Sequence, residues 1–502
     1  MKGVVAAGHH LTAEAGAQVM RDGGNAFDAA VCAVLTSFAA ESLLTGLGAG
    51  GFLLAHTASG EDHLYDFFVE AGGRGLDHEQ RAELVGVEVL FDDVPQLFNI
   101  GPSACGVPGT AAGLWEVAQR HCSMPFAALA APAIRWAREG VRVTPEQAYV
   151  FTILTPVITR FAETRTLYAP DGDVLEAGDL FRFPDLADAL ERFADEGPAS
   201  VYRGEAAERI SAWVCERGGL ISIEDLAAYR VIERDPVRTR YRGRDVLTNA
   251  PPSSGGILIA FALDLLERSP RQPAPESADG LALLADVMEQ ANQVRAGADF
   301  NRDLHDPDFA DRFLASSDRL GSTTHISVLD ADGNAVSVTC SNGTSSGVIV
   351  PGTGVHLNNM LGEEDLNPLG YHMHEAGTRV TSMMAPTLVL NRGRIELTVG
   401  SAGSNRVRSA ILQVIRYVVD EGMSVHEAIH AGRLHYENGV LHAEPGFDPA
   451  ALDELDSRGY QTVRWRGLNL YFGGAQAARR DPESGELSGA GDPRRGGVAV
   501  VV

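Results

Sequence analysis

The character of the sequence changes near residue 320, and this change limits the folds that are open to the chain. Before it, apolar residues recur at helical spacing in stretches such as "GTAAGLWEVAQRH" and "FAALAAPAIRWAREG", which predicts helices. After it, short alternating or β-branched runs such as "THISVL", "AVSVTCS" and "APTLVLN" predict strands separated by glycine-rich turns. The tail "SGELSGAGDPRRGGVAVVV" predicts a turn and a last buried strand. A mostly helical first part is therefore expected to combine with a strand-rich last part.

Composition narrows the classes of function. The 502 residues are 45% hydrophobic, enough for a large buried core, and the formal net charge is −26. Such a charge disfavours the phosphates of nucleic acid and anionic lipid surfaces as partners. Lys2 is the only lysine. Its isolation excludes a Walker A site, a pyridoxal phosphate Schiff base and a Ser-Lys dyad.

Cysteine spacing and the apolar runs bear on the compartment. The five cysteines show no Cys-x-x-Cys spacing and are interpreted as free thiols in a reducing compartment. The start, "MKGVVAAGHHLTAEAG", has too short an apolar run for a signal-peptide core. The run from Ala29 to Ala40 falls short of the roughly 20 residues that cross a bilayer. We expect a cytoplasmic protein without a membrane span.

Several short motifs resemble known sites, but their contexts point elsewhere. The glycines of 46–51 satisfy G-x-G-x-x-G, yet helix precedes and strand follows, so a tight turn is expected instead of a dinucleotide site. Residues 343–347 match G-x-S-x-G without the strand-to-helix context of a nucleophile elbow. Residues 330–333 lack the rest of a calcium loop, and His372 and His374 lack a third metal ligand. No metal and no organic cofactor are predicted.

The stretch "GSTTHISVLDADGNAVSVT" from position 321 predicts a β-hairpin, and Thr323 stands at its outer start. Thr323 is either an ordinary β-branched strand residue or a latent nucleophile. A threonine becomes a nucleophile when it is N-terminal, because its own α-amine, with a pKa of about 7.7–8.0, then serves as the base. That requires cleavage of the bond between Ser322 and Thr323, which the threonine hydroxyl can itself carry out in a strained turn.

Long motifs along nearly the whole chain decide whether Thr323 is an ordinary strand residue or a latent nucleophile. They are "GGNAFDAAVCAV" (24–35), "GLGAGGFLL" (46–54), "GVPGTAAGLWEV" (106–117), "LISIEDLAAYRVIERDPV" (220–237), "NAPPSSGGILIA" (249–260), "TTHISVLDADGNAVSVT" (323–339), "LNNMLGEED" (357–365), "RVTSMMAPTLVL" (379–390) and "GSAGSNRVRSAILQ" (400–413). With these motifs in this order, the chain resembles the γ-glutamyltransferase family of N-terminal-nucleophile hydrolases.

The resemblance implies an α/β fold, a four-layer αββα sandwich. It implies a precursor cleaved into a large-subunit segment, 1–322, mostly helical with core strands, and a small-subunit segment, 323–502, which together form one structural unit as a heterodimer. The terminal threonine would take an acyl group, usually γ-glutamyl from an amide such as glutathione, and pass it to water or to an amine. No cofactor is implied.

The resemblance also assigns roles to residues of the site. Thr323 matches the nucleophile and Ser341 the hydroxyl that hydrogen-bonds it. The backbone N–H groups of Gly403 and Ser404 match the oxyanion hole, where such donors are worth about 3–4 kcal/mol. Ser382 matches one of two adjacent serines that hold a substrate carboxylate.

The chain departs from the family around the acyl donor. Phe68 stands where members that bind a γ-glutamyl group have an arginine that clamps its α-carboxylate, Met383 replaces the second serine, and Met360 replaces a glutamine. The stretch 341–343 is "SNG", while Glu363, Glu364 and Asp365 keep acidic character near the family's amine-binding aspartate. The predicted substrate contacts are Phe68, Asn342, Asn359, Glu363, Asp365, Ser382 and Met383. An acylase acting on a non-glutamyl amide, or an uncleaved pseudoenzyme that binds a small amine or peptide, are the alternatives.

Overall fold

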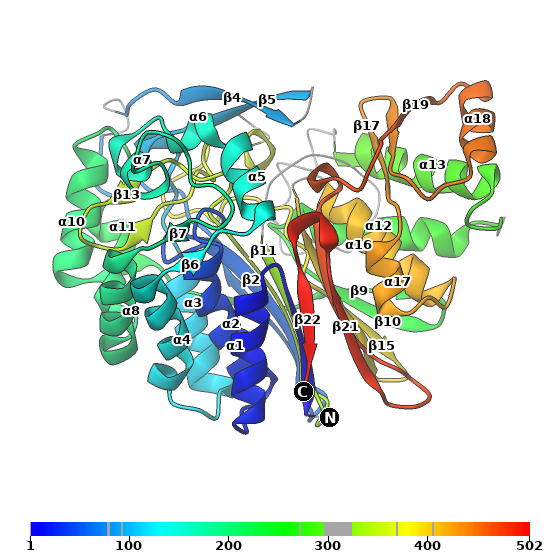
Figure 1. The fold of residues 1–502 in the computed structure, drawn as a ribbon, viewed down its shortest axis with the longest axis horizontal. Helices are drawn as coiled ribbons and strands as arrows, with labels where there is room; N and C mark the ends of the chain where they lie inside the picture. Colours follow the sequence, from blue (N-terminus) through cyan, green and yellow to red (C-terminus); the bar gives the residue numbers. More distant parts are fainter. Residues whose placement is uncertain are drawn as a thin grey trace.

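Two β-sheets lie face to face at the centre of the molecule (Figure 1). The computed structural model describes residues 2–77, 81–91, 94–270, 273–295, 324–367, 370–403 and 406–502. The first sheet has the strand order β22 (Val498–Val501), β1 (Gly3–Ala7), β11 (Thr324–Asp330), β12 (Ala335–Ser341), β2 (Gly50–His56), β3 (Asp62–Phe67) and β8 (Ile232–Arg234). The second has the order β21 (Leu487–Gly491), β20 (Gly474–Arg480), β16 (Arg394–Ala402), β15 (Thr387–Asn391), β10 (Arg244–Thr248) and β9 (Val237–Tyr241).

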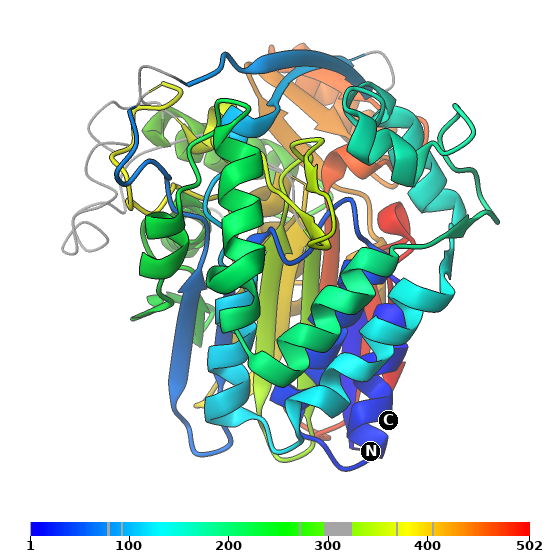
Figure 2. The same ribbon diagram turned by 90° about the vertical axis from the view of Figure 1, so that its left-hand side faces the viewer.

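Helices cover the outer faces of both sheets (Figures 1 and 2). The first sheet is covered by α1 (His10–Arg21), α2 (Ala26–Ala40), α3 (Thr110–His121), α4 (Phe126–Glu139) and α8 (Pro184–Glu196). The second is covered by α12 (Ser254–Arg268), α13 (Ala278–Arg295), α16 (Arg406–Val419) and α17 (Val425–His430). The structure therefore confirms the predicted four-layer αββα sandwich.

Three buried clusters correspond to the three interfaces between layers. Alternate residues of a strand point to opposite faces, so Ile326 and Val328 of β11 face the helices, whereas Leu329 faces the second sheet. The inter-sheet cluster also includes Phe52 of β2 and Leu388 of β15. The odd-numbered residues of β11 thus point between the sheets.

Shorter elements surround the sandwich. Helices and turns on the side of the first sheet are α5 (Pro145–Ile153), α6 (Thr155–Ile158), α7 (Ala162–Tyr168), α9 (Ala199–Tyr202), α10 (Gly204–Cys215), α11 (Ile223–Ala228) and η2 (Pro102–Ala104). Small sheets pair β4 (Val85–Phe91) with β5 (Val94–Ile100), β6 (Val141–Arg142) with β7 (Leu180–Phe181), and β13 (Ile349–Val350) with β14 (Val355–His356). The remaining elements are η3 (Glu364–Leu366), β17 (Leu434–Glu437), β18 (Val440–Ala443), α18 (Pro449–Ser457), β19 (Gln461–Arg464), η4 (Leu470–Phe472) and η5 (Pro493–Arg495).

The predicted hairpin, the predicted turn at 46–51 and the predicted last strand are all present in the structure. The hairpin is present as β11 and β12, and the Asp330 carboxylate accepts hydrogen bonds from the N–H groups of Gly333 and Asn334 in its turn. The turn at 46–51 leads into β2, and a Cβ at Gly48 would lie 2.1 Å from the carbonyl oxygen of His356, which explains its glycine. The expected buried last strand is wrong in one respect, because β22 is a half-exposed strand at the sheet edge. Among the described residues, no helix has the length and apolar character needed to cross a bilayer.

Candidate active site

The described residues of the predicted catalytic set lie at the ends of two strands, Ser341 at the end of β12 and Gly403 directly after β16. Ser322, Thr323 and Ser404 fall outside the described residues. The first described residue of β11 is Thr324, which pairs with Cys340 on β12. Ser341 follows Cys340 as the last residue of β12. It is fully buried, and its Oγ accepts a 2.7 Å hydrogen bond from the N–H of Gly343. A buried hydroxyl is therefore held at the end of β12, one residue past the partner of Thr324.

Three predicted substrate contacts come together in the segments that follow β12. The carbonyl of Asn342 accepts a 3.0 Å hydrogen bond from the N–H of Asn359. Asn359 Nδ2 donates to Thr344 Oγ1 over 2.8 Å. Glu363 Oε1 accepts from both the N–H and the hydroxyl of Thr344, at 3.1 and 3.0 Å. Thr344, which the sequence motifs did not single out, joins the cluster. Asp365 lies in η3, and its side chain is outside the described part.

This cluster contains polar atoms that lack a hydrogen-bond partner. Within the described part of the chain, both polar side-chain atoms of Asn342 and the Oδ1 of Asn359 are buried without one. Glu363 is 4% exposed, and burial raises the pKa of its carboxyl, although the hydrogen bonds from Thr344 oppose the shift. Buried amide groups are almost always hydrogen-bonded in proteins. The Asn342 amide thus lacks, within the described part of the chain, the hydrogen-bond partners that buried amides normally have.

The apolar replacements lie in the core between the sheets. The Phe68 ring is fully buried and stacks on Phe52, with ring centroids 5.3 Å apart. The sulfur of Met383 accepts a 2.9 Å hydrogen bond from the hydroxyl of Ser254, and its side chain is also buried. Both belong to the inter-sheet cluster. Their contact with substrate stays a prediction.

Ser382 and the nearby Arg379 already have partners within the protein. The Oγ of Ser382 accepts a 3.1 Å hydrogen bond from the N–H of Met384. Arg379 donates to the Phe68 carbonyl over 2.8 Å and pairs with Asp66 and Glu70 at 3.2 and 3.3 Å. Arg379 thus serves the local backbone and carboxylates, and it does not replace the missing clamp.

The predicted oxyanion segment starts where β16 ends. Gly403 has a φ of +117°, a conformation that favours glycine. A Cβ at Gly403 would lie 2.5 Å from the Cα of Gly473, so the two backbones touch. The N–H of Arg406, the first residue of α16, donates to the Gly403 carbonyl. A side-chain-free backbone at a strand end is suited to present N–H groups to a developing oxyanion.

Charged groups lie next to this backbone. A Cβ at Gly474 would collide with the Arg495 side chain, at 2.4 Å from its Cδ. Burial raises the pKa of Glu41 to about 7, and the charge of Arg495 opposes that shift. Glu41 and Arg495 line a small cavity of about 40 Å³ that also includes Gly8 and His9 at the end of β1. The space suffices for a water-sized group.

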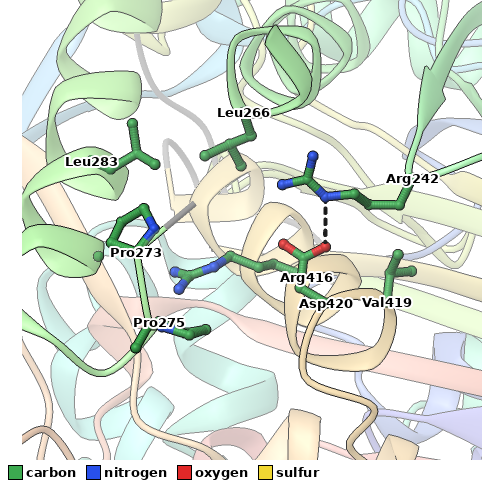
Figure 3. A pocket seen from close by; sticks show the side chains of 10 residues that line it. Arg242, Leu266, Pro273, Pro275, Leu283, Arg416, Val419 and Asp420 are labelled. Carbon is green, nitrogen blue, oxygen red and sulfur yellow. Dashed lines mark hydrogen bonds and ion pairs between the residues drawn. The ribbon is translucent and has the colours of Figure 1, made fainter. Parts of the chain in front are cut away.

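A larger crevice lies at the far end of α16 (Figure 3). Its volume is about 400 Å³, and Leu266, Pro273, Leu283, Arg242 and Asp420 are among its lining residues. The Arg242 Nε donates to Asp420 over 3.2 Å, as the dashed line in Figure 3 shows, and its Nη1 pairs with Glu267 at 3.1 Å. None of the residues that line the crevice belongs to the cluster around Thr344.

Comparison with known proteins identifies the family. The model of the family described as Gamma-glutamyltranspeptidase matches residues 12–502. The chain belongs to the gamma-glutamyltranspeptidase family. It is an enzyme of the N-terminal-nucleophile hydrolase class with γ-glutamyltransferase-like chemistry.

Relatives of this gamma-glutamyltranspeptidase family member include glutathione hydrolases and acylases. It is 31% identical to the "Glutathione hydrolase proenzyme" of Escherichia coli (strain K12) over 98% of this chain and 90% of that protein. It is 32% identical to the "Acylase ACY 1 proenzyme" of Pseudomonas sp. (strain SE83) over 100% and 94%. The crystal structure of a cephalosporin acylase from Bacillus halodurans has a TM-score of 0.83 at 27% identity, covering 99% of this chain and 95% of that one.

Proposed function

We propose that this chain is a precursor that cleaves itself between Ser322 and Thr323 and then works through Thr323. The hydroxyl of Thr323 attacks an amide carbonyl, and its α-amine takes the proton and passes it to the leaving amine. Water or an amine then loses a proton to the α-amine and displaces threonine from the acyl ester, and the α-amine passes that proton to the threonine oxygen. Support comes from the buried Ser341 hydroxyl, one residue past the partner of Thr324, and from the Gly403 backbone. The end of β16 would supply the oxyanion donors.

We further propose that the acyl donor is an amide whose acyl end needs no α-carboxylate. The observation that carries this proposal is the Phe68 ring, which is stacked on Phe52 where the family has its carboxylate clamp. The buried Arg379, which donates to the Phe68 carbonyl, is held by Asp66 and Glu70. A buried carboxylate without a partner is commonly destabilised by about 3–5 kcal/mol. Donors without that carboxylate should therefore react at least as well.

A γ-glutamyl donor such as glutathione is the second candidate, and Glu363 favours it. A buried carboxylate beside the unpartnered Asn342 amide can hold the ammonium group of a γ-glutamyl donor. The first candidate requires no recognition of a carboxylate on the donor, whereas the second requires recognition of the donor's ammonium group.

Four p-nitroanilides separate the candidates. The γ-glutamyl compound has both charged groups, glutaryl lacks the ammonium, 4-aminobutyryl lacks the carboxylate, and butyryl lacks both. Two pairs of compounds differ only in the carboxylate: γ-glutamyl with 4-aminobutyryl, and glutaryl with butyryl. In both pairs we expect kcat/KM to be unchanged or higher for the compound that lacks the carboxylate. A loss of about a hundredfold or more on its removal would contradict the proposal, because a site built for a polar group rejects analogues that lack it.

We also propose a cytoplasmic location. The five cysteines are free thiols, and Cys32, Cys105 and Cys340 are buried. Unpaired thiols are typical of reducing compartments. Fractionation of the source cells would test the location, and recovery of the protein in an exported fraction would contradict it.

A further inference from the structure

A buried histidine lies between the two sheets beside the start of β11, and the proposed chemistry does not use it. His325 is 1% exposed and points toward the second sheet, as Leu329 of the same strand does. Its Nδ1 lies 2.8 Å from Thr339 Oγ1 on β12, and its Nε2 lies 3.0 Å from Ser327 Oγ on β11. Both ring nitrogens are therefore engaged by hydroxyl groups.

The hydrogen-bond network fixes the roles of these atoms. Ser327 has one hydroxyl proton, which it donates to the carbonyl of Gln476 on β20 over 3.1 Å. With that bond made, its oxygen accepts from His325, and we assign the tautomer that carries its proton on Nε2 because it leaves every one of these groups paired. Nδ1 is then the acceptor, and the Thr339 hydroxyl donates to it. Through Ser327, one imidazole links β11 and β12 of the first sheet to β20 of the second.

The ring also packs on the strand that leads to the oxyanion segment. A Cβ at Gly400 on β16 would lie 2.2 to 2.6 Å from three atoms of the His325 ring. Gly400 is not among the residues with positive φ, so the ring itself accounts for the missing side chain. The imidazole lies directly against the backbone of β16, three residues before Gly403.

The contact between His325 and Gly400 lies close in sequence to the predicted nucleophile and to the predicted oxyanion segment. His325 comes two residues after Thr323, and Gly400 comes three residues before Gly403. The contact between His325 and Gly400 therefore sets the separation of two strands, one beginning beside the nucleophile and the other ending at the oxyanion segment. Displacing reacting groups by about 1 Å can cost about a hundredfold in rate.

We infer that His325 is a positioning residue, a neutral spacer that holds the nucleophile strand at the correct distance and register from the oxyanion strand. This inference rests on the proposed function. His325 is no general base, because both ring nitrogens are engaged and the ring is buried. Burial also lowers its pKa to about 3, so it remains neutral under assay conditions.

Substitutions at both sides of the contact test the inference. Gly400→Ala should lower kcat and the rate of self-cleavage by about tenfold or more, with little change in KM, because it pushes the strands apart without touching substrate. His325→Ala/Gly400→Ala removes the ring that the new methyl group meets, so it should be more active than Gly400→Ala alone. His325→Gln can keep the donor to Ser327 and His325→Asn the acceptor for Thr339, so each should retain more activity than His325→Ala.

His435→Asn is the matched control. His435 on β17 is also 1% exposed, and its Nδ1 lies 2.8 Å from the hydroxyl of Ser409. Its substitution should lower the unfolding midpoint as the His325 variants do, while kcat stays within about twofold of the starting enzyme. The comparison separates loss of a buried imidazole in general from loss of this spacer.

The possible results separate a failure of the inference about His325 from a failure of the proposed function. Wild-type cleavage and kcat in His325→Gln and His325→Ala would overturn the inference, and so would strictly additive losses in the double variant. If Gly400→Ala does not fold, the comparison of His325→Gln, His325→Ala and His435→Asn decides in the same way. If the unsubstituted chain neither cleaves nor turns over an amide, the proposed function fails, which is a distinct result from normal activity in the His325 variants.

Discussion

Glu363 combines a structural role with a proposed binding role, and a single substitution separates them. Its Oε1 holds the Thr344 backbone and hydroxyl, which a glutamine oxygen can also do. Glu363→Gln should therefore fold normally but lose the charge that an ammonium group needs. We expect kcat/KM to fall about tenfold or more for the γ-glutamyl and 4-aminobutyryl p-nitroanilides only. An equal loss with the butyryl compound would contradict a role in ammonium binding.

The buried, neutral state of His325 leads to a prediction about how stability depends on pH. Burial lowers its pKa from 6.5 to about 3, so the unfolded chain binds a proton at this residue more readily than the folded chain does. The free energy of unfolding should therefore fall as pH drops below about 6.5, by about 2 kcal/mol for this residue between pH 6.5 and 5. His325→Asn should flatten the pH dependence by that amount in denaturant titrations. An unchanged pH dependence would contradict the buried, neutral state.

The sequence predicts residues of this site unevenly. Asn359 and Glu363 fall in the motif 357–365, Ser341 and Asn342 follow the motif 323–339 directly, and the structure brings the four together. The role of Thr344 could not be predicted, because it depends on the fold of the loop that returns Glu363 to it. The sequence also gives no sign that Phe68 stacks on Phe52, since the pairing of two strands sets that contact.

Among the elements, β22 offers the clearest test because it closes the edge of the first sheet. It pairs with β1 from Val4–Val501 to Ala7–Val498, and the side chains of β1 are buried. Ending the chain at Gly497 would leave the backbone groups of β1 unpaired along that edge. We expect a lower unfolding midpoint and aggregation on heating, measured by scanning calorimetry and light scattering. An unchanged midpoint would show that β22 contributes nothing to the sheet.

The predictability of an element depends on how local its determinants are. The hairpin of β11 and β12 is visible in the sequence because its turn and its alternation lie within twenty residues, and Asp330 caps the turn. The strand β1 was not predicted. Its five residues, "GVVAA", become a strand only through pairing with β11 and β22, more than 300 residues away. The edge position of β22 depends on the same distant pairing.

In the whole molecule, the first sheet is built from strands that come before and after Thr323 in the chain. β1 lies between β11 and β22, and β12 pairs with β2. The second sheet joins β10 from the first segment to β15 from the last. Because a cut before Thr323 leaves all these pairs intact, the fragments should elute together from a sizing column and separate only in denaturant. Separate elution in native buffer would contradict one shared structural unit.

The central claim is that Thr323 becomes a free N-terminal residue, and intact mass with N-terminal sequencing of the purified protein tests it most directly. We expect fragments of 322 and 180 residues (502 − 322 = 180), the smaller beginning Thr-Thr-His-Ile, and we expect Thr323→Ala to remain a single chain without turnover. A single 502-residue chain after long incubation, or cleavage at the same bond in Thr323→Ala, would contradict the claim.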